Sequence, residues 1–381
     1  MTETSQRNAG IDALRGVSIL LVLIHHLALR IPLRDTALAD WLPRRLLSAL
    51  SYNGYEAVFV FFVISGFLIT WHALQRAPSL ARIDVRRFYL RRVARIVPPL
   101  ALLLAVLSAM HLLGVAQYVI ERDDQSLPGA LAAAVSFTLN WYEGRTGWLP
   151  GGWDVLWSLS IEEVFYLVFP LLCLVLRRRA WLVIALSLLA VSLPVTRAAL
   201  DGNEIWQEKA YLPGFSAIAA GVLTALAVKH WAMPASTARW CRAAGVIGLL
   251  AVLLCGRELW ASLGNGYMLV LTGASALLIA GLHAMPPRTP MRTLRWLRSA
   301  GRLSYELYLT HMFVVFALVG VYRRLGADVR HGAWWYLALL PLCWVLAWAF
   351  AQAWTLPAER WIKQRWLRGA PLGKATSSPA G

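Results

Sequence analysis

The chain has 381 residues, of which 59% are hydrophobic and only 15% charged, and its formal net charge is +17. A soluble domain of this length carries nearer to a quarter charged residues, so the composition excludes a soluble fold. The arginines cluster at the ends of apolar runs, which indicates membrane topology rather than nucleic-acid binding.

The apolar runs recur until about residue 356 and predict an all-α, polytopic membrane bundle of about ten helices. The expected spans are 16–33, 55–74, 96–117, 155–176, 180–198, 211–228, 243–258, 265–284, 303–321 and 334–356. The first run lacks a small-residue cleavage site, so we expect a permanent span there. Residues 1–358 are expected to form one integral membrane domain, followed by a basic cytoplasmic tail at 359–381 that is disordered at its end.

An eleventh apolar run, 127–139, is shorter and rich in small residues. If it does not cross, both termini share one side of the membrane with 25 of the 37 Lys and Arg residues. If it did cross, the three arginines at 177–179 would move to the outer side, against the positive-inside rule. We therefore expect both termini in the cytoplasm and a re-entrant or interfacial segment at 127–139. The last outer loop departs most from the positive-inside rule, because it carries Arg323, Arg324 and Arg330.

The first span carries an arginine and two adjacent histidines. Arg15 and His26 are eleven residues apart, so on an α-helix they share a face about 16 Å apart, whereas His25 points roughly 100° away. With the N-terminus inside, Arg15 lies at the cytoplasmic boundary and His26 past the middle of the membrane. A single intramembrane histidine is more often a packed core residue, but the polar residues of other spans favour a functional site.

The fourth span begins with Trp157 and a polar stripe. Ser158, Glu162 and Tyr166 follow at i, i+4 and i+8, so they share one face. This helix is expected to run inward, which predicts Glu162 at about the depth of His26, where its carboxylate could orient the imidazole. The alternative is a carboxylate at the outer rim that simply reaches water.

The ninth span carries a similar stripe of polar residues. Its members are Ser304, Tyr308 and His311, at i, i+4 and i+7, and Tyr305 lies beside them. Hydrogen bonding between helices is an equally good account of such residues, so both a scaffold role and a site role stay open.

An arginine-rich segment lies between the second and third spans. Arg92 and Arg95 are three residues apart and therefore neighbours on a helix face at the cytoplasmic mouth. Two guanidinium groups so placed suit phosphate groups. Topology and contact with anionic lipids are the alternatives. The four cysteines form no C-x-x-C pair and no zinc spacing, so no metal site is expected.

Taken together, these motifs resemble the acyltransferase 3 family, whose members modify bacterial surface glycans and other acceptors. The matching segments are Asp12 to His26, Phe61 to Ile69, Arg92 with Arg95, Trp157 to Glu162 with Tyr166, and Ser304-Tyr305 with Tyr308 and His311. One departure concerns the second helix, where many members have an acidic residue two positions before the Phe-Phe pair. This chain has Phe59 there and Glu56 one turn earlier.

The resemblance implies an acyl-CoA donor, commonly acetyl-CoA, an essential His26, and a donor site near Arg92 and Arg95. We expect transfer of an acyl group, most simply acetyl, from cytoplasmic acyl-CoA to a hydroxyl of an extracytoplasmic surface polysaccharide, in the bacterial cytoplasmic membrane. The expected catalytic pair is His26 and Glu162, with no metal, and Arg15 joins the two donor-binding arginines. The expected substrate-binding residues are Trp157, Ser158, Tyr166, Ser304, Tyr305, Tyr308 and His311.

The sequence leaves other functions open. A transporter or flippase for a lipid-linked glycan would also carry polar stripes, and a scaffold or sensor would tolerate loss of His26 and Glu162. Within the enzyme class, a lipid or a secondary metabolite is an alternative acceptor, and a covalent acyl group on His26 is an alternative to direct transfer. The length of the acyl chain and the oligomeric state cannot be deduced from the sequence.

Overall fold

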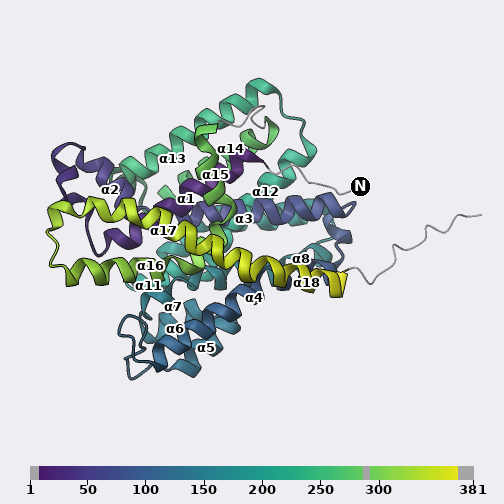
Figure 1. Ribbon diagram of the computed structural model, residues 1–381. Helices are drawn as coiled ribbons and strands as arrows, with labels where there is room; N and C mark the ends of the chain where they lie inside the picture. Colours follow the sequence, from purple (N-terminus) through teal and green to yellow (C-terminus); the bar gives the residue numbers. More distant parts are fainter. Residues whose placement is uncertain (1–7, 286–291, 368–381) are drawn as a thin grey trace, which may run out of the picture.

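The computed structural model describes residues 8–285 and 292–367, which form helices and loops without a strand (Figure 1). Eight described segments are long and apolar enough to cross a membrane, which confirms the predicted all-α membrane bundle. They are Ala9–Ala28, Gly54–Arg76, Val85–Leu112, Gly151–Val175, Glu204–His230, Ala235–Ala284, Ser304–Arg324 and Ala333–Leu367. The segment Ala235–Ala284 contains two long helices, and Arg179–Val191 is a shorter apolar helix.

The helices follow one another with short connections. The first half of the chain forms α1 (Ala9–Ala28), α2 (Arg44–Tyr52), α3 (Gly54–Arg76), α4 (Val85–Leu112), α5 (Leu127–Val135), α6 (Leu139–Thr146), α7 (Gly151–Asp154) and α8 (Trp157–Val175). The second half forms α9 (Arg179–Val191), α10 (Leu193–Ala198), α11 (Glu204–Lys209), α12 (Tyr211–His230), α13 (Ala235–Leu263), α14 (Tyr267–Ala284), α15 (Arg295–Arg302), α16 (Ser304–Arg324), α17 (Ala333–Phe350) and α18 (Leu356–Leu367), with a π-helical turn at Ala351–Thr355.

The bundle has two ends that are named here from α1. The near end is where α1 begins, and the far end is where α1 finishes, next to α2 (Figure 1). At the near end Asn8 donates a hydrogen bond to the carbonyl of Leu282, at the end of α14. At the far end Tyr336, near the start of α17, donates to the carbonyl of Ile31. The helices therefore run alternately between the two ends.

Small residues let the helix backbones touch. A Cβ on Gly66 of α3 would lie 2.0 Å from the carbonyl oxygen of Ile218 in α12, and a Cβ on Gly221 of α12 would lie 2.0 Å from that of Val63. A Cβ on Gly301 of α15 would lie 1.8 Å from the carbonyl oxygen of Asp12 in α1. Lipid tails are as apolar as leucine, so membrane helices associate through such close contacts.

The far-end layer comprises α5, α6, α7 and α11, which cover one side of the far end (Figure 1). Helix α5 has nine residues and spans about 14 Å, well short of a bilayer core of about 30 Å. A buried ion cluster fastens the layer: Lys209 Nζ lies 2.8 Å from Glu143 Oε2 and also bonds Asp154. Helix α8 begins at Trp157, directly after α7, and packs against α6 of this layer. The side chain of Trp157 is therefore buried, with 8% of its surface exposed.

Helix α18 extends past the predicted domain boundary at residue 358. It packs along α4, and its Glu359 carboxylate lies 3.5 Å from the guanidinium of Arg95. The first part of the expected tail is thus an ordered part of the bundle. The expected disorder at the end of the tail concerns residues 368–381, which lie outside the described residues.

Candidate active site

A cavity of about 810 Å³ runs through the bundle along α3. Its walls include α3 residues from His72 to Val58, and fourteen residues of helix correspond to about 21 Å. The cavity therefore extends from the near end most of the way to the far end. Its volume falls within the range of small-molecule and cofactor sites, which is roughly 300–1,000 Å³.

Nine of the twelve predicted site residues line this cavity. They are Arg15, Arg92, Arg95, Ser158, Glu162, Tyr166, Ser304, Tyr305 and Tyr308, contributed by α1, α4, α8 and α16. The stripes found on separate spans are thus brought together around one volume. The remaining three, His26, His311 and Trp157, lie behind its inner end.

The near part of the cavity is densely charged. The guanidinium of Arg92 lies 4.3 Å from the centre of the Tyr166 ring, a cation–π contact. Arg95 lies 3.4 Å from Glu306 and 3.5 Å from Glu359, so two carboxylates compensate its charge. A phosphate bound at Arg95 must displace or join these carboxylates, whereas Arg92 presents its guanidinium against an aromatic face.

Glu162 lies with Arg15 and not with His26. Its carboxylate interacts with the hydroxyls of Ser65 and Tyr166 and, electrostatically, with Arg92 and Arg15. Arg15 in turn donates to the hydroxyl of a further stripe residue, Ser304, over 2.7 Å. Among the described residues no contact joins the carboxylate of Glu162 to the ring of His26.

The separation of Glu162 from His26 follows from the register of α8. Ser158, in the first turn of α8, is the residue that bonds Tyr308, whose ring lies beside that of His311. Glu162 lies one turn further along the helix and interacts with Arg92 and Arg15 instead. Direct pairing of His26 with Glu162 finds no support in this geometry.

A pair of hydroxyls closes the inner end of the cavity. Ser158 Oγ donates to the Tyr308 hydroxyl over 2.7 Å, and Tyr308 donates to the carbonyl of Val155 over 2.8 Å. Both side chains line the cavity. The ring of Tyr308 lies 5.9 Å from that of His311, which stands on the far side of this pair.

Two histidines from α1 and α16 meet behind the hydroxyl pair. The ring centres of His26 and His311 are 5.0 Å apart and the rings are inclined by 43°. Nδ1 of His311 lies 2.8 Å from the carbonyl oxygen of Tyr308, which can only accept, so Nδ1 carries the hydrogen. In the neutral ring Nε2 is then an acceptor. This atom is buried without a hydrogen-bond partner among the described residues, beside His26.

The residues flanking this pair are packed. Trp157 lies 6.3 Å from the ring of Tyr55 in a stacked arrangement and 6.1 Å from Phe62 edge-on, and it does not line the cavity. His25 faces away from His311, and its Nδ1 lies 2.9 Å from the carbonyl oxygen of Ser51 in α2. These contacts indicate that Trp157 and His25 stabilise the packing of the helices.

The structure adds three cavity residues that sequence reasoning did not select. Ser65 bonds the hydroxyl of Tyr166, and Glu306 and Glu359 bracket Arg95. Glu306 is 2% exposed, and its Oε2 has no hydrogen-bond partner among the described residues. An ionisable residue within an apolar span was the available signal. Glu359 carried none, because it lies beyond the apolar run.

Known proteins resemble this chain in sequence. Two relatives are the O-acetyltransferase OatA of Staphylococcus aureus strain NCTC 8325 and its counterpart from strain COL, each 29% identical over 181 residues. The match covers 45% of this chain and 25% of each relative, so the chain spans about a quarter of the length of the curated relatives it matches. No solved structure matches. The acyltransferase domain model matches residues 8–352, which is nearly the whole described bundle, and the chain therefore belongs to the acyltransferase 3 family.

Proposed function

We propose that this chain transfers an acetyl group from acetyl-CoA, entering at the near end, to a hydroxyl of a surface-polysaccharide sugar that approaches from the far end. The near end, with both termini, faces the cytoplasm of a bacterium, and the bundle spans the cytoplasmic membrane with ten helices. The observation that carries the proposal is the long cavity, which begins among arginines and ends one hydroxyl pair away from His26.

The shape and charge of the cavity support an acyl-CoA donor. CoA has a phosphate-rich head and a long, narrow arm that ends in the thioester. Arg92 and Arg15 offer positive charge in the near part of the cavity, and Arg95 adds a third guanidinium that exchanges its carboxylate partners on binding. Arginine suits phosphate because of its planar, multiple donors. The arm extends along α3 toward Tyr308.

His26 acts as the general base in this proposal. It takes the proton from the acceptor hydroxyl as the oxygen attacks the thioester carbonyl. The new C–O bond forms, the C–S bond breaks, and the CoA thiolate leaves and recovers the proton from His26. The hydroxyls of Ser158 and Tyr308 line the cavity where the thioester arrives, and they exchange their bonds to Tyr308 and to the Val155 carbonyl for bonds to the thioester oxygen as negative charge develops. Glu162 acts on the donor side, through Arg15 and Arg92.

His311 takes the positioning role that the sequence had assigned to Glu162. Its Nε2 has no other hydrogen-bond partner among the described residues and accepts the N–H of His26 when that ring turns toward it. This hydrogen bond fixes the tautomer of His26 and leaves its second nitrogen with a lone pair for the acceptor hydroxyl. His311 is therefore a positioning residue that acts through His26.

The test uses proteoliposomes with acetyl-CoA labelled in the acetyl group and a surface-glycan acceptor. Wild type should transfer the label to the glycan and release CoA in equal amount. His26→Ala should abolish both, whereas His331→Ala, which removes an exposed far-end histidine, should leave both unchanged. Transfer by His26→Ala at the wild-type rate would overturn the catalytic assignment.

The same preparation separates the rival mechanisms. Glycan crossing the bilayer without release of CoA would establish a transporter and refute the enzyme reading. Label that stays on the protein when the acceptor is left out would establish an acyl-enzyme intermediate in place of direct transfer. Acetyl-CoA supplied only on the side of the termini should support the reaction, and its failure there with success on the other side would reverse the proposed orientation.

A further inference from the structure

A second cavity, of about 580 Å³, lies at the far end and is separate from the donor cavity. It is bounded by α2, the start of α3, the end of α13 and the start of α14. We call it the far-end cavity. No residue predicted as part of the active site lines it, and the mechanism above does not use it.

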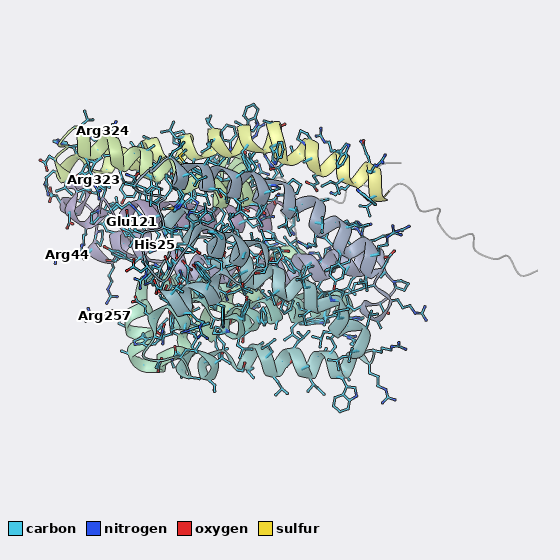
Figure 2. All side chains as sticks on the ribbon, turned by 90° about the horizontal axis from the view of Figure 1, so that it is seen from below. His25, Arg44, Glu121, Arg257, Arg323 and Arg324 are labelled. Atoms are coloured by element: carbon cyan, nitrogen blue, oxygen red, sulfur yellow. The ribbon has the colours of Figure 1, made fainter. Side chains whose placement is uncertain are left out.

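The far-end cavity holds two unpaired arginines. Arg44 and Arg257 line it, and neither has an ion-pair partner among the described residues. Figure 2 shows both at the same end of the bundle. The third arginine, Arg45, is neutralised by Glu258. The other lining carboxylate, Glu56, accepts a hydrogen bond from Tyr267 over 3.1 Å. The cavity therefore has an excess of positive charge, which the exposed guanidinium groups of Arg44 and Arg257 carry.

A kink in α13 shapes the cavity wall. Cys255 has non-helical angles of φ −123° and ψ 26°, which break the helix at this point. Asn53, which follows α2, donates to the carbonyl of Leu253 over 2.9 Å and to that of Ala49 over 2.7 Å, so it fixes the kink to α2. A Cβ on Gly256 would meet no atom within 4 Å, which marks the open volume. The hollow is thus built into the fold by specific contacts.

Helix α2 connects this cavity to the histidines of the active site. Arg44 and Ser48 of α2 line the cavity, and further along the helix the backbone carbonyl of Ser51 accepts a hydrogen bond from His25, next to His26. The seven residues from Arg44 to Ser51 correspond to about 10 Å of helix. A group held at Arg44 and Arg257 is therefore within reach of a hydroxyl placed at His26 by the same molecule.

We propose that the far-end cavity binds a phosphate or diphosphate group carried by the acceptor, and so anchors the acceptor while its hydroxyl meets His26. The proposal rests on the proposed acyl transfer for the identity of the ligand as acceptor. Two unpaired guanidiniums suit phosphate oxygens through bidentate hydrogen bonds. The aliphatic side chains of Leu253 and Leu254, which also line the cavity, suit the first part of a lipid tail. The phosphate thus belongs either to a lipid carrier or to the glycan itself.

Binding is measured on the purified full chain in detergent, without acyl-CoA, using inorganic pyrophosphate, farnesyl diphosphate and glucose 1-phosphate as probes. The double variant Arg44→Gln with Arg257→Gln should weaken binding by about a hundredfold, roughly tenfold for each lost charged hydrogen bond. The matched control is Arg323→Gln with Arg324→Gln, which removes the same charge from the same end (Figure 2) but outside the cavity. This control should bind like wild type.

The outcomes distinguish a lipid phosphate from a glycan phosphate, and they test the far-end site separately from the proposed acyl transfer. Tighter binding of farnesyl diphosphate than of pyrophosphate indicates a lipid carrier, and tighter binding of glucose 1-phosphate indicates the glycan's own phosphate. Equal loss in both double variants, or none in either, overturns the site, as does displacement of the probes by phosphatidylglycerol nanodiscs at equal potency. Acyl transfer without probe binding refutes this inference alone, whereas probe binding without acyl transfer refutes the proposed function alone. Equal melting temperatures of wild type and variants would show that a change in binding does not result from unfolding.

Discussion

Replacing Lys209 by Met should destabilise the bundle by breaking the ion cluster of the far-end layer. The side chains of Lys209 and Glu143 are 2% and 0% exposed, and that of Asp154 is 17% exposed. Without the ammonium, two carboxylates stay together in a site shielded from water. Removing one partner of such a buried pair costs about 3–5 kcal/mol. The loss should also reduce activity, because the layer sets where α8 begins.

The destabilisation should depend on pH. Burial, followed by the neighbouring Asp154, already holds the pKa of Glu143 well above its ordinary value of 4.5, and loss of Lys209 removes the main opposing charge. The folded variant then binds more protons than the unfolded chain above pH 4.5. Its stability therefore falls as pH rises, by up to about 1.4 kcal/mol per pH unit until the raised pKa is passed. Lys209→Met should be closest to wild type near pH 5 and furthest from it near pH 8.

Thermal unfolding in detergent at several pH values measures this effect. Lys229→Met is the matched control, because it also replaces a lysine by methionine, but Lys229 is exposed in the last turn of the next helix, α12. Adding Glu143→Gln to Lys209→Met should restore part of the melting temperature at pH 8 by removing one buried charge. Equal melting of Lys209→Met and wild type at pH 8 would show that the cluster does not hold the layer in place.

Three further substitutions test the site and its frame. His311→Phe should lower kcat roughly a hundredfold, with the KM for acetyl-CoA unchanged, and His311→Gln should recover part of kcat by supplying an acceptor; unchanged kcat in His311→Phe would refute the positioning role. Tyr308→Phe should lower acceptor-dependent CoA release roughly a hundredfold, because one of the two hydroxyl donors to the thioester oxygen is lost, and unchanged release would contradict that role. Gly301→Val should prevent folded expression, because its Cβ would meet the Asp12 carbonyl at 1.8 Å, whereas Gly320→Val, with open space, should not; equal yields would contradict it.

Local patterns in the sequence predicted much of this architecture. The second expected span, 55–74, corresponds to α3 at Gly54–Arg76, because a long apolar run leaves a helix few alternatives. The spacing of Ser304 and Tyr308 correctly placed both on one helix face that lines the cavity. Periodicity determines which side chains share a face, so these residues were accessible to sequence reasoning.

The depth of one helix relative to another was not accessible. Glu162 was placed near His26 from its expected depth in the membrane, but Ser158, one turn earlier, is the α8 residue that bonds Tyr308 beside His311. His311 became the neighbour of His26 through the packing of α16 on α1, and no spacing within either helix encodes that contact. The same holds for Glu359, which reaches Arg95 only because α18 lies along α4.

The backbone contacts between α3 and α12 also determine how the donor cavity can respond to a ligand. Carbonyl oxygens of each helix sit in the space left by the missing Cβ of Gly66 and Gly221, so these two helices cannot slide without a clash. The cavity therefore has one stiff wall, formed by α3. Another part of the wall includes α18, and side chains connect this C-terminal part to α4, through the ion pair between Arg95 and Glu359 and the hydrogen bond from Trp354 to the carbonyl of Pro98. We therefore expect the cavity to expand toward α4 and α18 when a bulky molecule binds. These two helices, and not α3, would then move.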